Sequence, residues 1–492
     1  MQIIFNLLRN IIWNALLFFN HSSIRLTRPK TGGAAGGASP DAPGGGVSGR
    51  IIVSLHRNGM MDLFLSRYIW PEVVALTSVQ WHRNFLTRWL IGGVGVSRAK
   101  DRGKDHKGDA PPQTSMVEAP LISSSALPIR DNDDASRAAS KIQTENTQAM
   151  KKCAELLRQG RAVGIAPEGT SQLGPGHLPF QKAAARVAAK VLEKQGEVRV
   201  LPASPVYLQA WAWRSPAELY AGPELVFTAG EKMNDIHREI SRALEAVTLK
   251  ADSLDALMDR QAAAWELCAF QALKGASGQS SPTPAAMAES PLTCGDALPL
   301  RGGETFSSVL LESPDEMLDE IAGAHKRFAE RLPSEALFYG VIAPDALNDS
   351  AAEEFKPQPL TLALYSALSL LGGAARLLAW PPLYLSRRLR RPLVDDLNVV
   401  ALWRGLIALP LIGLWGIALG LAAAWLWGPP GALIFLILGL AAIILEPERL
   451  RLKAAVLAVE TVGRSELRNY FNELMAIKNK YRAAENQKDE NA

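Results

Sequence analysis

The chain has 492 residues, of which 48% are hydrophobic, and its 53 basic and 49 acidic residues leave a formal net charge of +4. This length can bury a sizeable core and hold roughly three average domains, whereas so balanced a charge argues against a nucleic-acid-binding protein. The three cysteines are far apart and form no CxxC motif or Cys/His cluster. This argues against a disulfide framework and a zinc site and favours a reducing compartment.

Residues 1–30 begin with the apolar run MQIIFNLLRNIIWNALLFFN, in which the polar residues fall on one helical side. This pattern predicts an amphipathic helix that lies in the plane of a membrane. A secretory signal is disfavoured, because no positive charge precedes the apolar run. Residues 31–49 (TGGAAGGASPDAPGGGVSG) have the composition of a linker.

Residues 50–270 alternate short apolar runs with helical patterns. The expected strands are 51–55, 72–76, 94–96, 161–166 and 198–208, and the expected helices are 59–70, 82–91, 144–159 and 180–194. Such alternation predicts an α/β domain with a mostly parallel central sheet flanked by helices. The polar stretch at about 101–141 is expected to be a loop insertion.

The remainder is expected to comprise a low-complexity linker (271–304), a helical segment (305–358), membrane-embedded helices (359–447) and a charged helical tail (448–492). The stretch 406–427 contains no charge and is long enough for a helix to cross a hydrocarbon core of ~30 Å. A buried helical core is the alternative. If 406–445 is a hairpin, the basic residues on both sides predict that both flanks are cytoplasmic.

The segment RIIVSLHRNGMMDLFL, at 50–65, places His56 directly after an expected strand and Asp62 six positions later. If His56 precedes the helix and Asp62 lies one turn inside it, the carboxylate can fix the imidazole tautomer and leave the other ring nitrogen free as a base. A capped strand–helix turn is the alternative. The look-alike WHRN around His82 has no acid within the next six residues, so the tripeptide HRN alone indicates little.

Three further motifs follow in order: V-x-R-x-x-D at 96–101, P-E-G-T-S at 167–171, and the strand VRVLPASPVYL at 198–208. With H-x5-D, this series resembles the glycerolipid acyltransferase superfamily. More narrowly, it resembles the glycerol-3-phosphate and dihydroxyacetone-phosphate acyltransferases, over roughly residues 50–270. The resemblance implies direct transfer of an acyl group from an acyl thioester such as acyl-CoA, with no acyl-enzyme, no metal and no cofactor.

The resemblance also implies roles for individual residues. His56 would deprotonate the acceptor hydroxyl and Asp62 would orient His56. Arg98 would hold the acceptor phosphate, although a simple pair with Asp101 is the alternative. The motif at 167–171 would bind the glycerol part. Its implied substrate-binding residues are Glu168, Gly169, Thr170 and Ser171, and Pro202 would help form the acyl-donor pocket.

Leu55, Gln181 and Ala183 depart from the family's usual residues, which bears on the substrate more than on the reaction. Lysophosphatidate is therefore an alternative acceptor, and a non-catalytic membrane lipid-binding protein of the same fold is the alternative function. The expected location is an integral membrane protein with its site facing the cytoplasm, in a bacterial inner membrane or an endoplasmic reticulum. The expected partners are membrane lipids, acyl-CoA and the acceptor.

Overall fold

The computed structural model describes residues 2–21, 24–27, 49–83, 85–97, 132–212, 215–277, 305–337, 340–342, 370, 380–390, 397 and 400–490. The strands are β1 (Ile24–Thr27), β2 (Arg50–Ser54), β3 (Val74–Ser78), β4 (Val94–Val96), β5 (Val163–Ile165), β6 (Glu197–Tyr207), β7 (Ala217–Ala221) and β8 (Leu225–Thr228). The main helices are α1 (Gln2–Asn20), α2 (Met60–Ile69), α3 (Phe85–Ile91), α4 (Asn132–Arg158), α5 (Ala183–Leu192), α6 (Met233–Ala246), α7 (Leu254–Ser277), α9 (Phe306–Glu312), α10 (Asp315–Ala329), α12 (Val400–Val462) and α13 (Arg464–Glu490).

Within the described residues, eight strands form one sheet in the order β1–β7–β6–β2–β5–β3–β4, with β8 also paired to β6. Strand β2 runs parallel to both β5 and β6, and β3 runs parallel to β4 and β5. Strands β7 and β8 pair antiparallel with β6, and β1 pairs parallel with β7. The predicted α/β class with a mostly parallel central sheet is therefore confirmed.

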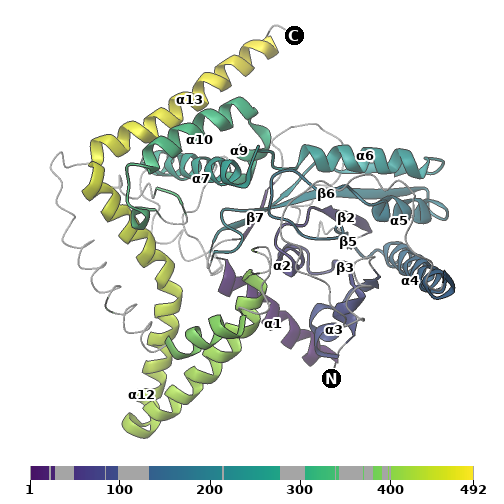
Figure 1. Cartoon of the computed structure of the whole chain (residues 1–492), viewed down its shortest axis with the longest axis horizontal. Coiled ribbons are helices and arrows are strands. Elements are labelled where there is room, and N and C mark those ends of the chain that lie inside the picture. The colour runs from purple at the N-terminus through teal and green to yellow at the C-terminus, as the bar shows by residue number, and fades with distance from the viewer. Residues whose placement is uncertain are drawn as a thin grey trace.

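Helices cover both faces of this sheet, as Figure 1 shows. Side chains alternate along β2, so Ile51 and Val53 face a core formed with α4, α5 and α6, whereas Ile52 faces a core formed with α1 and α2. All three side chains are buried, which is the usual pattern of a parallel strand with helices on both sides. The three layers bring the carboxyl ends of β2 and β5 to the same edge, where His56 and Glu168 follow.

Several elements differ from the sequence-based expectation. Helix α4 begins at Asn132, inside the expected insertion of 101–141, because the polar run from Asn132 is rich in alanine and continues the helical pattern of the following residues. Strands β1, β7 and β8 were not predicted. The segment 82–91 divides into a 3-10 helix (Val79–His82) and α3. Residues 98–131 lie outside the described part of the chain.

The N-terminal segment contains more than the expected helix, since β1 follows α1 and pairs with β7 in the central sheet. The apolar face of α1 packs into the protein through Trp13, Leu16 and Leu17, which are buried against α2. The ring N–H of Trp13 donates to the Leu90 carbonyl at 2.8 Å. Helix α1 and strand β1 are therefore structurally part of the α/β domain.

Helices α7, α9, α10 and α13 pack together beside β7 and extend the same core. The tail expected to be only a charged helix thus buries Tyr470, Phe471 and Leu474 of α13. At the centre of this helical unit lies Glu266, which accepts hydrogen bonds from the Tyr470 hydroxyl, from His325 Nδ1 at 3.1 Å and from the Ile342 backbone N–H at 2.5 Å. A buried carboxylate with three donors joins segments far apart in sequence.

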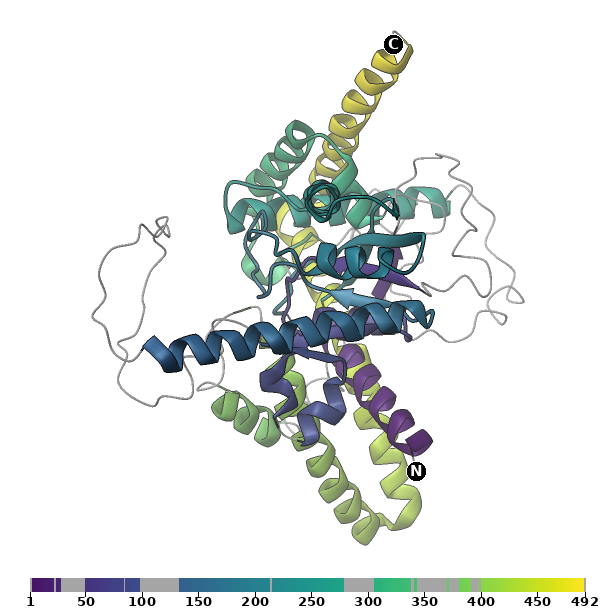
Figure 2. The same cartoon turned by 90° about the vertical axis from the view of Figure 1, so that its right-hand side faces the viewer.

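Helix α12 leaves the body of the protein and doubles back on itself (Figures 1 and 2). Gly428 has φ 72° and ψ 178°, which divides α12 into two arms. The arms pack together, since Leu436 Cδ2 lies 3.7 Å from where a Cβ on Gly420 would be. Among the described residues, the stretch Val400–Ile437 is long and apolar enough to cross a membrane, and 17% of its most apolar 18 residues are buried in the protein. One such helix is weak evidence of membrane association.

Candidate active site

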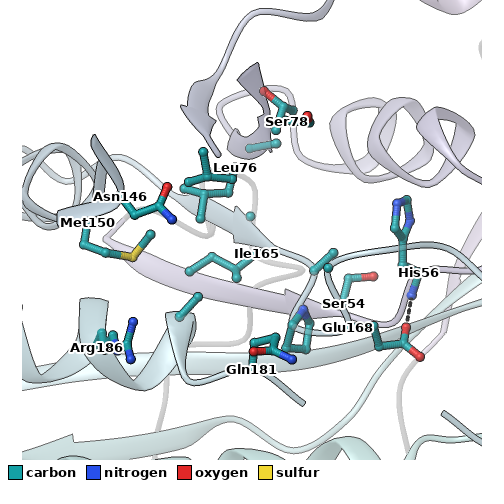
Figure 3. Close-up of a pocket in the computed structure, with 18 of the residues that line it drawn as sticks. Ser54, His56, Leu76, Ser78, Asn146, Met150, Ile165, Glu168, Gln181 and Arg186 are labelled. Atoms are coloured by element: carbon teal, nitrogen blue, oxygen red, sulfur yellow. Dashed lines mark hydrogen bonds between the residues drawn. The ribbon is translucent and has the colours of Figure 1, made fainter. Parts of the chain in front are cut away.

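The site begins where two neighbouring parallel strands end. Strand β2 pairs with β5 in the register Ile52↔Gly164, so the turns after the two strands lie side by side. The backbone N–H of His56 donates to Glu168 Oε2 at 2.6 Å (Figure 3). The other carboxylate oxygen of Glu168 accepts the backbone N–H of Leu178 at 3.1 Å. Glu168 is 5% exposed, so this buried carboxylate ties the two turns together.

The turn from β2 into α2 brings His56 and Asp62 into contact. Gly59 makes the turn with φ 50° and ψ −133°, a combination that strongly favours glycine. Asp62 lies in the first turn of α2, and its Oδ2 accepts the backbone N–H groups of Arg57 at 2.7 Å and of Asn58 at 2.8 Å. The same oxygen lies 2.9 Å from His56 Nδ1.

A fourth donor completes the environment of Asp62. Tyr207, at the end of β6, donates its hydroxyl to Asp62 Oδ1 at 2.6 Å. Burial, together with the charge and hydrogen bond of Asp62, raises the pKa of Tyr207 well above its ordinary value, so the phenol stays protonated as a donor. With both its oxygens held, the 5%-exposed Asp62 is fixed in position and can accept a hydrogen bond from the protonated Nδ1 of His56.

This arrangement defines the chemistry open to His56. When Nδ1 carries the proton and donates to Asp62, Nε2 holds a lone pair. Nε2 has no hydrogen-bond partner among the described residues, and the side chain is 23% exposed and lines a cavity. The imidazole can therefore take a proton from a bound group.

Arg57, which the sequence analysis did not single out, holds the loop that follows Glu168. Its guanidinium donates to the carbonyl of Gly174 at 3.2 Å and to that of Gly176 at 2.6 Å. The Gln172 N–H also donates to the His56 carbonyl at 2.9 Å. Burial lowers the pKa of Arg57, partly offset by the charges of Glu168 and Asp62. Loop 169–178 is thus fixed against the turn that carries His56.

The cavity beside His56 has a volume of about 1340 Å³. Asp62, Glu168, Gly169 and Thr170 line it near His56. Much of the remaining wall is apolar and includes Ile52, Leu63, Val73, Leu76, Trp81, Val96, Met150, Ile165 and Phe180. A further part carries Lys182, Arg186, Lys190 and His237. The cavity therefore joins a proton acceptor, an apolar surface and positive charge.

Two of the remaining predicted site residues, Arg98 and Ser171, are not among the described residues that line the cavity. Arg98 lies outside the described residues, although Ser97 before it lines the cavity. Asn146 holds Ser97, since its Oδ1 accepts the Ser97 N–H at 2.9 Å and its Nδ2 donates to the Ser97 carbonyl at 3.0 Å. Ser171 is not among the residues that line the cavity.

Pro202 is also absent from the described lining of this cavity, in contrast to its expected place in an acyl-donor pocket. It is buried in the central strand β6, opposite Val53 of β2, and its carbonyl accepts the Gly222 N–H at 2.9 Å. Strand pairing on both sides of β6 keeps Pro202 inside the sheet. The structure does not bring it to the site.

The look-alike His82 has no carboxylate partner among the described residues. Its Nε2 lies 2.7 Å from the Thr77 hydroxyl, and burial, followed by the charges of Arg88 and Lys152, lowers its pKa. In the same described part of the chain, no group of three His, Cys, Asp or Glu side chains could hold a metal ion. The expectation of an enzyme without metal or cofactor stays a prediction.

The three-layer α/β fold, with a histidine–aspartate pair and a glutamate at the ends of parallel strands, is that of an acyltransferase domain. Residues 47–208 match the protein-family model described as Acyltransferase. This match supports an acyltransferase domain of the glycerolipid acyltransferase superfamily and suggests acyl transfer in lipid metabolism. Neither a curated protein nor a solved structure matches the chain.

Proposed function

We propose that this protein is a membrane-bound O-acyltransferase of phospholipid synthesis. It moves a fatty acyl group from an acyl thioester, acyl-CoA, to the hydroxyl of glycerol 3-phosphate or dihydroxyacetone phosphate. The observation that carries the proposal is His56, whose Nδ1 contacts the fixed Asp62 at 2.9 Å while its Nε2 is free of described partners beside a large cavity.

In the proposed reaction, His56 Nε2 removes the proton of the acceptor hydroxyl as the oxygen attacks the thioester carbonyl. The carbon–sulfur bond of the resulting adduct then breaks, and the proton passes from His56 to the departing thiolate. Asp62 stabilises the imidazolium that forms between these two steps. No side chain becomes acylated, so a nucleophilic serine or cysteine is not needed.

The cavity offers a place for each part of the substrates. Its apolar wall suits a fatty acyl chain, because burial of each methylene contributes about 0.8 kcal/mol. Glu168 already accepts two backbone N–H groups, yet a carboxylate has about four acceptor sites and can also accept a glycerol hydroxyl. The expected phosphate ligand Arg98 follows Ser97, which lies in the cavity wall.

The apolar hairpin of α12 supports attachment to a membrane. Its exposed side chains include Leu414, Ile417, Leu421, Trp425, Trp427, Leu433 and Ile434. The helix at 380–390, which precedes α12, carries Arg387 and Arg388 on its exposed surface. Positive charge beside an apolar helix favours a cytoplasmic position for this flank and for the site.

Replacement of His56 tests the proposal, with His82 as the matched control. General-base catalysis contributes on the order of 10²- to 10⁴-fold, so His56→Ala should lower kcat for acyl transfer to glycerol 3-phosphate by that factor. His82→Ala should remain close to the wild type, because His82 contacts Thr77 and no carboxylate. Equal kcat values for the two variants, in an assay limited by chemistry, would contradict the catalytic role.

Experiments can distinguish the proposed function from two alternatives, a lysophosphatidate acceptor and a non-catalytic lipid-binding protein. A side-by-side assay with glycerol 3-phosphate, dihydroxyacetone phosphate and lysophosphatidate identifies the acceptor, and a preference for lysophosphatidate would replace the proposed acceptors. The absence of transfer from labelled acyl-CoA to any of them would favour the alternative of a non-catalytic membrane lipid-binding protein of the same fold. The four described contacts of the Asp62 carboxylate, all to hydrogen-bond donors, favour a catalytic role.

A further inference from the structure

Three cationic residues lie four positions apart on one side of α5, where they line the cavity. Lys182 precedes the helix, and Arg186 and Lys190 follow one and two turns later. Residues with this spacing share a helix face, and the row is about 12 Å long at 1.5 Å per residue. The opposite face of α5 buries Ala184, Val187 and Val191 in the core, among others. The core therefore fixes which side of α5 the row occupies.

The row begins next to the turn that carries Glu168 and leads away from it. The Gln181 N–H donates to the Pro167 carbonyl at 2.8 Å, which fixes the start of the row beside that turn. Figure 3 shows Gln181 between Glu168 and Arg186, with Arg186 on the same side of the cavity as Met150 and Asn146 and away from His56. Arg186 is thus at the part of the cavity that is remote from the proton acceptor.

Most of this positive charge is not compensated by described acidic side chains. Lys182 Nζ donates to the neutral amide oxygen of Asn234 at 3.1 Å, whereas Lys190 pairs with Glu193 at 3.0 Å. No ion pair joins Arg186 to a carboxylate among the described residues, and Glu193, which also lines the cavity, is the partner of Lys190. On the facing helix α6, Asp235 already pairs with Arg238 at 2.7 Å.

The hydrogen bond from Lys182 to Asn234 of α6 shows that the two helices face each other here. Burial, followed by the charge of Lys182, lowers the pKa of His237 on the same helix. His237 also lines the cavity. A cavity end with two uncompensated cationic side chains and a nearby imidazole attracts an anion with several acceptor oxygens.

We propose that this row binds the phosphate groups of a nucleotide-type acyl donor, the part of acyl-CoA farthest from its thioester. The inference rests on the proposed function, since that function places the thioester beside His56, at the other end of the cavity. In glycerol 3-phosphate the phosphate and the reacting hydroxyl are separated by only a few bonds, so its phosphate must lie close to His56. In acyl-CoA the long pantetheine arm separates the phosphates from the thioester, which suits a cationic site remote from His56.

The first experiment compares two donors with the same acyl chain, acyl-CoA and the phosphate-free acyl-pantetheine. With the full-length protein, Arg186→Gln should raise KM for acyl-CoA by about ten- to a hundredfold, the effect of losing a charge-assisted contact. KM for acyl-pantetheine and for glycerol 3-phosphate should stay within about twofold of the wild type. The control Arg238→Gln removes the same charge from α6 beside His237, where Arg238 pairs with Asp235, and should leave all three values unchanged.

An equal rise in KM for both donors, or a rise confined to glycerol 3-phosphate, would overturn the inference. A second measurement does not depend on turnover: titration with adenosine 3′,5′-bisphosphate, which carries nucleotide phosphates and no acyl group. Binding that Arg186→Gln weakens at least tenfold, and Arg238→Gln does not, supports the inference even if no acyl transfer is found. Acyl transfer that depends on His56 but is indifferent to Arg186 would retain the proposed function and refute the phosphate site.

Discussion

Tyr207 and Asp62, 145 positions apart in the sequence, share a buried hydrogen bond of 2.6 Å. Tyr207 donates to Oδ1, which leaves Oδ2 to contact His56 Nδ1 and the backbone N–H groups of Arg57 and Asn58. Because a carboxylate held on both oxygens cannot rotate, the direction of the His56 ring is set by strand β6 as well as by helix α2. Tyr207 is therefore a positioning residue for His56.

Tyr207→Phe tests this role, since phenylalanine keeps the aromatic ring and removes only the hydroxyl. A hydrogen bond to a charged group contributes about 1.5–3 kcal/mol, so kcat should fall roughly tenfold or more while KM for both substrates changes little. The pH profile of kcat should shift as well, because Asp62 loses a donor that stabilises its charged form. An unchanged profile with a lowered unfolding temperature would indicate a purely structural role.

Arg98 should act on the acceptor substrate. Arg98→Ala is expected to raise KM for glycerol 3-phosphate on the order of ten- to a hundredfold and to leave KM for the acyl donor nearly unchanged. Arg98→Lys should restore only part of the loss, because an ammonium lacks the two-pronged geometry of a guanidinium. Equal losses for donor and acceptor would indicate that Arg98 supports the fold.

The α12 hairpin should hold the protein in a membrane. The wild type is expected to stay in the membrane pellet after high salt and after alkaline carbonate, as determined by immunoblot of the two fractions. Leu421→Asp places a charge on an exposed apolar position of α12, which costs about 2.5–3.5 kcal/mol at the centre of a membrane helix, and should increase release by carbonate. Val226→Asp, on the exposed edge strand β8, serves as the control and should remain in the pellet. Complete release of the wild type by carbonate would contradict membrane integration.

The buried cluster of Glu266, His325 and Tyr470 should make stability fall as pH rises. Burial by itself lowers the pKa of His325, but the charge and hydrogen bond of Glu266 and the charge of Asp259 together raise it. The stabilisation is present in full below the unfolded-state pKa of about 6.5 and is lost as pH rises through the higher folded-state pKa. His325→Gln should therefore flatten the decrease in unfolding temperature above pH 6.

His82 gives the opposite sign and serves as the control for this measurement. Its pKa is lowered, so the folded state binds fewer protons there than the unfolded state and stability rises with pH. His82→Gln removes that rise, which lies below the unfolded-state pKa of about 6.5, and should leave the decrease at higher pH unchanged. A variant of His325 with the same pH dependence as the wild type would show that the cluster stays in one protonation state across this range.

Local patterns in the sequence were sufficient to predict the central part of the fold and the first pair of site residues. Strand–helix alternation predicted β2, β5 and β6 and the helices between them, because apolar period and turn residues are properties of short segments. The spacing of His56 and Asp62 predicted their contact across a strand–helix turn, which the structure contains at 2.9 Å. The type of each element and the His56–Asp62 contact both depend on residues that are close together in the sequence.

Contacts between distant segments could be decided only by the tertiary structure. The pairing of β2 with β5 and β6 brings Glu168 to the His56 backbone and Tyr207 to Asp62, and no local pattern specifies which strands are neighbours. The same holds for Pro202, whose motif indicated a pocket although pairing with β2 buries it inside the sheet. The packing of α5 on the core turns Arg186 toward the cavity, whereas the sequence shows only a charge on an amphipathic helix. Local sequence patterns therefore determined the central strands and helices and the turn between His56 and Asp62, and the burial of apolar faces against one another determined which side chains meet.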